Sequence, residues 1–128
     1  MSKTFNSSVN QIKDINTWKQ FFAEFFATGF FVFIGSGAVV STGIASSGVL
    51  DVGRLVAIAL AHGLAICLLA YSVGHISGGH INPAITIAAI INRKISWVMG
   101  NIFILGQISG AIVFAFILKF VIPDVHEG

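Results

Sequence analysis

The sequence predicts an all-α membrane protein with three transmembrane helices and one re-entrant half-helix. The chain of 128 residues is 55% hydrophobic and only 9% charged, whereas about a quarter of the residues of a soluble domain are charged. Three apolar runs are each long enough to cross a bilayer. A fourth run follows a glycine-rich loop and has about half the length that a bilayer requires. This length fits one domain.

The N-terminal part divides into a polar segment and the first span. Residues Met1–Thr17 contain too few apolar side chains to order by themselves, so we expect a cytoplasmic tail there and the membrane domain over 18–128. Phe21–Val40 would give about 30 Å of helix, enough to cross. A cleaved signal peptide is the alternative for this run, but its apolar region would be about 7 to 15 residues long and would not contain Glu24.

The remaining elements are predicted from composition and from the positions of helix-breaking residues. Ser41–Arg54 is rich in Gly and Ser and is expected to be a loop. Leu55–Gly74 and Trp97–Ile122 are expected to be the second and third spans. Between them, Gly74–Pro83 is too polar and glycine-rich to continue as helix through lipid. The apolar Pro83–Ile91 is too short to cross and is therefore expected to be re-entrant.

The basic residues predict the orientation of the spans. The positive-inside rule places the side with more Lys and Arg in the cytoplasm. We therefore expect an integral, multi-pass protein of the plasma membrane, with a cytoplasmic N-terminus and a half-helix that enters from the cytoplasmic side. The larger group is Lys3, Lys13, Lys19, Arg93 and Lys94, and the smaller is Arg54 and Lys119.

Several classes of protein are disfavoured. A net charge of +2 is too small for a nucleic-acid partner, which needs many phosphates neutralised. Cys67 is the single cysteine, and His75 and His80 have no Cys or carboxylate nearby to complete a metal site. The sequence offers no nucleophile with a base, no phosphate loop and no carboxylate pair. We expect no enzyme, no metal and no cofactor.

Asn82-Pro83-Ala84 has the local pattern of a helix start. Asn is a good N-cap, and Pro is favoured at the first helical position. Alone, this tripeptide indicates no more than a helix. Inside a membrane, however, a half-helix N-terminus directs a partial positive charge and the Asn82 amide donors into the interior. A water oxygen or a hydroxyl is a suitable acceptor for them.

The segment Ser77–Thr86, SGGHINPAIT, resembles the first Asn-Pro-Ala box of the aquaporin and glycerol-facilitator family, the major intrinsic proteins. It does not resemble the second box, which an Arg normally follows. The resemblance covers nearly the whole chain after the tail, and it implies passive transport of water or small neutral solutes. Its other patterns are Ala23-Glu24-Phe25 with Phe31 and Gly35, Ala61-His62-Gly63-Leu64, and Gln107 with Gly110.

The resemblance also implies which residues contact the solute. Asn82 would donate to the permeating molecule at the middle of the membrane. His62 falls at the selectivity constriction, where many water channels have Phe and glycerol channels often have Trp. Without the resemblance, a histidine packed against a hydrogen-bond partner is the alternative for His62. The other implied pore residues are Pro83 and Ala84, the carbonyl ladder Gly78, Gly79 and His80, and the apolar wall Phe31 and Ile66.

Two further sets of residues are expected to support the pore. Glu24 resembles a glutamate that braces the pore loops through hydrogen bonds, and Gln107 would assist it. A lone charge within a membrane costs at least a few kcal/mol, so bracing would give this carboxylate the partners that it needs. Small residues spaced four apart allow close helix packing, and they are Ala59 and Gly63, and Gly106 and Gly110.

The expected partners follow from the family's architecture, in which two inverted halves meet at the membrane centre. This sequence matches the first half, so we expect membrane lipid and a separately encoded second half as partners. An antiparallel homodimer is the alternative, but the charge bias disfavours dual topology. A higher oligomer is compatible with either. A non-conducting truncated or structural membrane subunit is the alternative from a different class.

Overall fold

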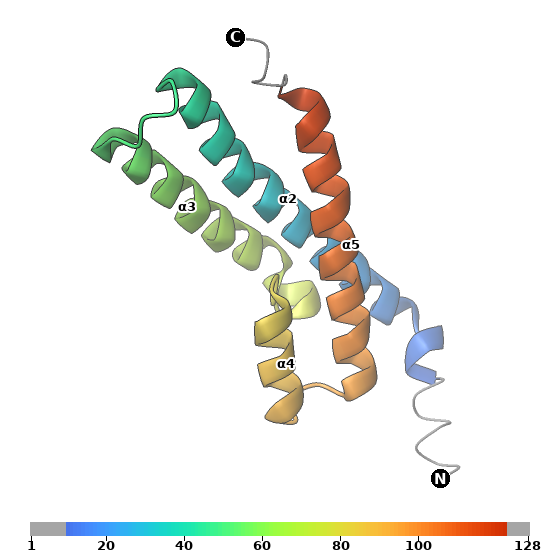
Figure 1. Cartoon of the computed structure of the whole chain (residues 1–128). Coiled ribbons are helices and arrows are strands. Elements are labelled where there is room, and N and C mark those ends of the chain that lie inside the picture. The colour runs from blue at the N-terminus through green and yellow to red at the C-terminus, as the bar shows by residue number, and fades with distance from the viewer. Residues whose placement is uncertain (1–9, 123–128) are drawn as a thin grey trace.

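The computed structural model describes residues 10–122 and is built from helices (Figure 1). They are α2 (Ile15–Ala45), α3 (Val52–Ser77), α4 (Pro83–Ile91) and α5 (Trp97–Val121). The all-helical fold class is therefore confirmed. Residues 1–9 of the expected tail and residues 123–128 lie outside the described residues.

Helix α2 is the central element of the fold. It packs against α3 on one side and α5 on the other, while α4 packs against α5. Figure 1 shows α2 and α3 side by side as a hairpin, with α5 crossing α2 and α4 lying beside the lower half of α5. The turn from α3 into α4 therefore lies near the crossing of α2 and α5.

Helix α2 is longer at both ends than composition predicts. It begins at Ile15 because the Asp14 side chain caps it, accepting from Asn16 N at 2.9 Å. It ends at Ala45, so the expectation of a loop from Ser41 was wrong for its first five positions. Gly and Ser weaken a helix in water, but transmembrane helices tolerate Gly well.

The second half of the expected loop is also partly helical. Helix α3 begins at Val52, and Asp51 caps it by accepting from Arg54 N at 2.7 Å. The connection between α2 and α3 is therefore short. At the other end, α3 continues to Ser77, three residues beyond the expected end at Gly74.

The half-helix has the predicted bounds. Helix α4 covers Pro83–Ile91, with Asn82 as N-cap and Pro83 in the first turn. Helix α5 begins after Ser96, whose side chain accepts from Met99 N at 3.1 Å. Helices α2, α3 and α5 are long and apolar enough to cross a membrane, whereas α4, with 9 residues, is about half of the necessary length.

Part of the expected tail packs on the helical domain. The Thr17 hydroxyl donates to the backbone carbonyl of Gln11 at 2.7 Å, and Thr17 is buried. The Ser96 hydroxyl donates to the Gln11 side-chain oxygen at 2.9 Å. Gln11 therefore joins the start of α2 to the start of α5.

The contact between α2 and α5 depends on two small residues. A Cβ atom at Gly110 would collide with the backbone carbonyl of Phe25, and one at Gly106 would lie 2.9 Å from the carbonyl oxygen of Phe21. One turn farther along, the Phe114 ring lies over Gly29 and meets Phe30 edge to face, with 4.7 Å between ring centroids. Glycine is needed here because the two backbones approach so closely.

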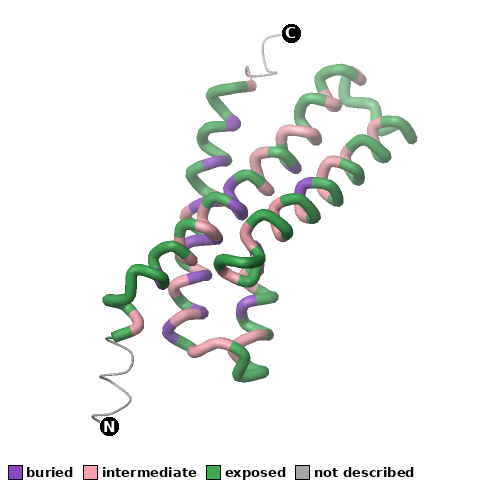
Figure 2. The backbone as a smooth tube through the Cα atoms, turned by 180° about the vertical axis from the view of Figure 1, so that it is seen from behind, coloured by how far each residue is buried: buried purple, intermediate pink, exposed green. Residues whose placement is uncertain are grey.

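The outer surface is apolar, and α3 is the least covered helix. In the apolar 18-residue stretch of α3, only 6% is buried inside the protein, whereas 33% of the corresponding stretch of α5 is buried. Figure 2 shows buried positions gathered where α2 and α5 cross, while α3 is mostly exposed. An apolar surface of this extent indicates lipid or a partner protein as its surroundings.

Candidate functional site

The turn between α3 and α4 has an unusual backbone. Gly78, Gly79 and Ile81 all have positive φ angles, of 91°, 66° and 52°. Glycine adopts this region freely, but a branched residue such as Ile81 pays of order 1 to 3 kcal/mol for it. Ile81 is also buried. Other contacts must therefore hold this segment, residues 78–82, which we call the pore loop because the resemblance given above predicts that it lines a pore.

The carboxylate of Glu24 on α2 supplies those contacts. Its Oε1 accepts from Ser77 Oγ at 2.6 Å and from His80 N at 2.9 Å. Its Oε2 accepts from Ile81 N at 2.7 Å and from Gln107 Nε2 at 2.7 Å. Glu24 is fully buried, and its two oxygens receive four donors. These four hydrogen bonds compensate the strained backbone of the pore loop.

Thr86 on α4 is a second centre of hydrogen bonds at the pore loop. Its Oγ1 lies 3.0 Å from Gln107 Nε2, 3.0 Å from His80 Nδ1 and 3.2 Å from the carbonyl oxygen of Asn82. Thr86 is fully buried. Sequence reasoning did not single it out, although its place four residues after the N-cap was a usable signal. Glu24, Gln107 and Thr86 thus join α2, α5 and α4 to the loop.

Asn82 ends the pore loop and starts α4. Its Oδ1 accepts from Ala84 N at 2.8 Å, so the other side-chain atom, Nδ2, is directed away from the helix end. The Asn82 residue is exposed, and Pro83 follows it in the first turn. Nothing in the described part of the chain, residues 10–122, accepts from Asn82 Nδ2, so its two N–H groups can meet an acceptor outside this helix. The half-helix N-terminus adds a partial positive charge at the same place.

His62 lies elsewhere, between α3 and α2. Its Nδ1 is 2.9 Å from the carbonyl oxygen of Ile58, which can only accept, so Nδ1 carries the proton. The ring stands edge to face against Phe31, with 5.9 Å between centroids, and covers Gly35, where a Cβ would lie 2.5 Å from Nε2. Ile66 is half-buried one turn farther along α3.

The remaining predicted residues divide by their surroundings. Gly106 and Gly110 pack on α2 as described. Ala59 and Gly63 are exposed, and no described atom lies within 4 Å of a Cβ built at Gly63. A packing role for Ala59 and Gly63 therefore stays a prediction that needs a partner outside the described chain.

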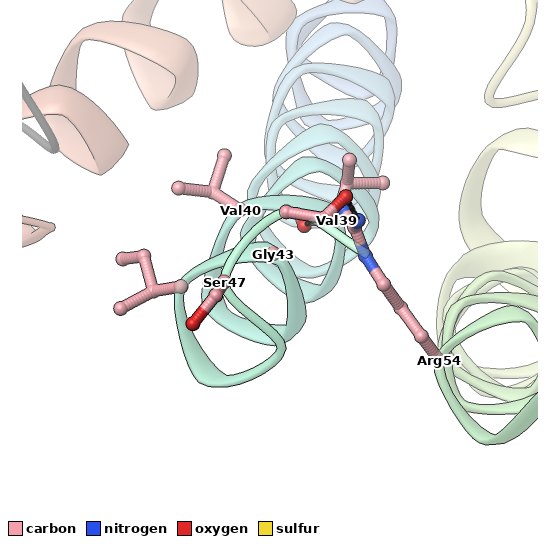
Figure 3. A pocket seen from close by; sticks show the side chains of 7 residues that line it. Val39, Val40, Gly43, Ser47 and Arg54 are labelled. Atoms are coloured by element: carbon pink, nitrogen blue, oxygen red, sulfur yellow. Dashed lines mark hydrogen bonds between the residues drawn. The ribbon is translucent and has the colours of Figure 1, made fainter. Parts of the chain in front are cut away.

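A groove of about 520 Å³ lies at the C-terminal end of α2 (Figure 3). It is next to the start of α3, whereas the pore loop follows the end of α3. The Arg54 guanidinium reaches across it from α3 and donates to the carbonyl oxygens of Gly48, Val49 and Val39, at 3.0, 3.3 and 3.3 Å. These bonds place a cation at the C-terminal end of α2, which the helix dipole favours. The groove lining is Val39, Val40, Gly43, Ile44, Ser47, Gly48 and Arg54.

Neither histidine of the loop region belongs to a metal cluster among residues 10–122, where no group of three His, Cys, Asp or Glu side chains comes together. His75 is exposed at the end of α3. The His80 ring instead lies edge to face on Phe103, with 5.3 Å between centroids.

These features define the class of the protein as a multi-pass integral membrane protein with a half-length helix. It has three apolar helices long enough to cross a membrane, the half-length α4, and a buried carboxylate that holds the loop before α4. Residues 11–128 match the family model described as "Major intrinsic protein", and the chain belongs to that family. It is a family of channels, not of enzymes.

Curated relatives agree with this assignment. The chain is 38% identical over 118 residues to the lens fiber major intrinsic protein of Ovis aries and 39% identical to that of Mus musculus, in each case over 92% of this chain and 43% of the relative. It is 45% identical over 111 residues to aquaporin-4 of Mus musculus, over 87% of this chain and 34% of the relative. The chain thus spans less than half the length of the curated relatives it matches.

Proposed function

We propose that this chain forms one half of a membrane channel through which water or small neutral solutes pass passively, and that it conducts after pairing with a second, inverted half. The observation that supports this most is the state of the Asn82 amide. Ala84 N fixes its oxygen at 2.8 Å, so that the Nδ2 donors are presented at the N-terminus of a half-length helix.

The chemistry of the pore loop suits a small neutral molecule that both donates and accepts. The Asn82 amide donors would bind a water or hydroxyl oxygen. The carbonyl oxygens of Gly78, Gly79 and His80 have no recorded donor among residues 10–122, and they would accept from the same molecule. The partial positive charge of the helix N-terminus disfavours cations. No covalent step is needed.

A second half is proposed because two apolar faces of the described helices have no partner. Among the helices within residues 10–122, α3 contacts α2 alone, and its outer face is apolar. On α4, Ile85 and Ile87 are both about half exposed. A second set of spans would cover these faces and bring a second half-helix opposite α4, as the inverted architecture requires.

We further propose that His62, with Phe31 and Ile66, forms the narrow part of the pathway in the assembled channel. The fixed Nδ1–H of His62 leaves Nε2 as an acceptor, which a water molecule can use. A polar ring smaller than Trp favours water over glycerol. Pro83 and Ala84 are proposed to line the path beside Asn82.

Stopped-flow light scattering on vesicles tests the proposal. Vesicles that hold this chain together with a candidate second half should shrink faster in an osmotic gradient than empty vesicles and than vesicles with either chain alone. Water and glycerol are compared in parallel. Equal rates in all vesicles, with both chains shown to be inserted, would favour the non-conducting membrane subunit instead.

The homodimer alternative needs a separate measurement. A C-terminal tag accessible from only one side of the membrane excludes an antiparallel pair, and this is the result that the charge bias predicts. If this chain conducts alone and the tag is accessible from both sides, the partner is a second copy of this chain and not a different second half.

A further inference from the structure

We propose that the Thr86 hydroxyl is a positioning group that holds the His80 ring in its Nδ1–H form, so that Nε2 becomes a hydrogen-bond acceptor on the pore loop. This inference deepens the proposed function, on which its importance for transport rests. The underlying geometry is the set of three contacts at Thr86 Oγ1: Gln107 Nε2 at 3.0 Å, His80 Nδ1 at 3.0 Å and the Asn82 carbonyl oxygen at 3.2 Å.

Gln107 can meet Thr86 only as a hydrogen-bond donor. Its Nε2 also lies 2.7 Å from Glu24 Oε2, a carboxylate oxygen that can only accept from it. The amide nitrogen must therefore face Glu24 and Thr86, because the reverse orientation would place two oxygens against each other. Gln107 therefore donates a hydrogen bond to Thr86, and this bond occupies one of the two lone pairs of the Thr86 hydroxyl.

The Thr86 hydroxyl has three neighbours but only one proton to donate. A hydroxyl has one proton to donate and two lone pairs. The Asn82 carbonyl oxygen, which also receives Thr86 N at 3.1 Å, can only accept, so its contact with Thr86 Oγ1 is a hydrogen bond only when the Thr86 proton is directed to it. His80 Nδ1 must then be protonated, and it donates to the second lone pair of the Thr86 hydroxyl. All three contacts are satisfied in this one arrangement.

The consequence appears at the other ring nitrogen. His80 is half-buried, and its Nε2 has no recorded protein partner among residues 10–122 and is not one of the enclosed polar atoms there. In a neutral ring protonated at Nδ1, this Nε2 carries a lone pair. The pore loop would then present a donor at Asn82 Nδ2 and an acceptor at His80 Nε2, which suits a molecule with both polarities.

Nitrogen-15 NMR of histidine-labelled full chain in lipid nanodiscs, recorded at about pH 8, tests the proposal directly. The His80 signals are assigned by their loss in His80→Asn. We expect a protonated Nδ1 and an unprotonated Nε2 in the unaltered protein. A predominantly Nε2–H ring would overturn the proposal, whatever the variants do.

Variants then separate positioning from packing. Thr86→Val keeps the shape and removes the hydroxyl, and it should shift the His80 tautomer ratio toward Nε2–H by about a factor of ten, of the order expected for losing one hydrogen bond. Thr86→Ser should restore the original ratio. The matched control is Thr42→Val, which removes a hydroxyl bonded to the Ala38 carbonyl in α2. An unchanged ratio in folded Thr86→Val would contradict a role for Thr86.

This measurement is independent of transport. An Nδ1–H ring in a chain that conducts nothing with any second half would sustain the role of Thr86 and reject the proposed function. Rapid water flux together with an Nε2–H ring would support the proposed function and reject the role of Thr86.

Discussion

Gln107 donates from Nε2 to Oε2 of Glu24 over 2.7 Å, although the two residues are 83 positions apart in the sequence. Both side chains are fully buried. The bond joins α5 to α2 at the level where the pore loop also meets Glu24. This buried hydrogen bond links the packing of α2 against α5 to the conformation of the pore loop. A substitution at Glu24 or at Gln107 should therefore disturb both the helix packing and the loop.

The first prediction concerns the charge of Glu24. Glu24→Gln keeps the size but replaces an acceptor-only group by an amide, so at least one of the four donors at this site loses its acceptor. We expect a loss of about 1.5 to 3 kcal/mol in the free energy of unfolding and faster hydrogen exchange at the amides of His80 and Ile81. The control is Asp51→Asn, at an exposed helix cap. Unaltered exchange at both amides would show that Glu24 does not hold the loop.

The second prediction concerns the proposed donor at Asn82. Asn82→Asp replaces amide donors by a carboxylate, which would repel a solute oxygen and attract cations. We expect water flux through an active complex to fall at least about tenfold, equivalent to about 1.4 kcal/mol, as measured by stopped-flow light scattering. Asn101→Asp, an exposed asparagine on α5, is the matched control. Equal flux in the two variants would remove Asn82 from the pathway.

The third prediction compares two glycines with the same substitution. Gly110→Ala places a Cβ against the carbonyl of Phe25 and should force α2 and α5 apart, at about 1 to 3 kcal/mol. Gly63→Ala meets open space and should be neutral or stabilising by about 0.5 to 1 kcal/mol, because alanine favours helix. Reversible unfolding in mixed micelles measures both values. Equal effects would argue against close packing at Gly110.

The fourth prediction concerns the end of α2. Arg54→Gln removes the cation from the carbonyls of Val39, Gly48 and Val49. The Gly48 amide, which donates to the Gly43 carbonyl at 2.8 Å, should then exchange faster with solvent, while the amides of the pore loop keep their rates. Lys119→Gln serves as the charge control. Acceleration at both ends of the molecule would show that Arg54 acts on the whole fold rather than on this turn.

The sequence predicted the elements better than their ends. Asn82 and Pro83 are strong local signals, and α4 has the predicted bounds for that reason. The loop expected from Ser41 was too long, because Gly and Ser signal a turn in water but are accepted in a membrane helix. The caps at Asp14 and Asp51 were available in the sequence and mark where α2 and α3 begin.

The site was less accessible to sequence reasoning than the fold. Glu24 and Gln107 were singled out through a family resemblance, since nothing local pairs two residues so far apart. Thr86 was missed because a threonine in an apolar helix looks like an ordinary packing residue. Its place four residues after the N-cap indicates only the contact with the Asn82 carbonyl oxygen, whereas its proposed role also depends on Gln107 from α5, which local patterns do not encode.

The pore loop and α4 are predicted to enter and leave the membrane on the same side, and the proposed function depends on this. Single cysteines at Ser47 and at Lys94, in a Cys67→Ser background, test it with a bulky, membrane-impermeant maleimide applied to sealed vesicles. A re-entrant α4 predicts that the two positions label from opposite sides, and that a cysteine at Ala84 stays protected from both. Labelling of Ser47→Cys and Lys94→Cys from the same side would mean that α4 crosses the membrane, and would contradict the account.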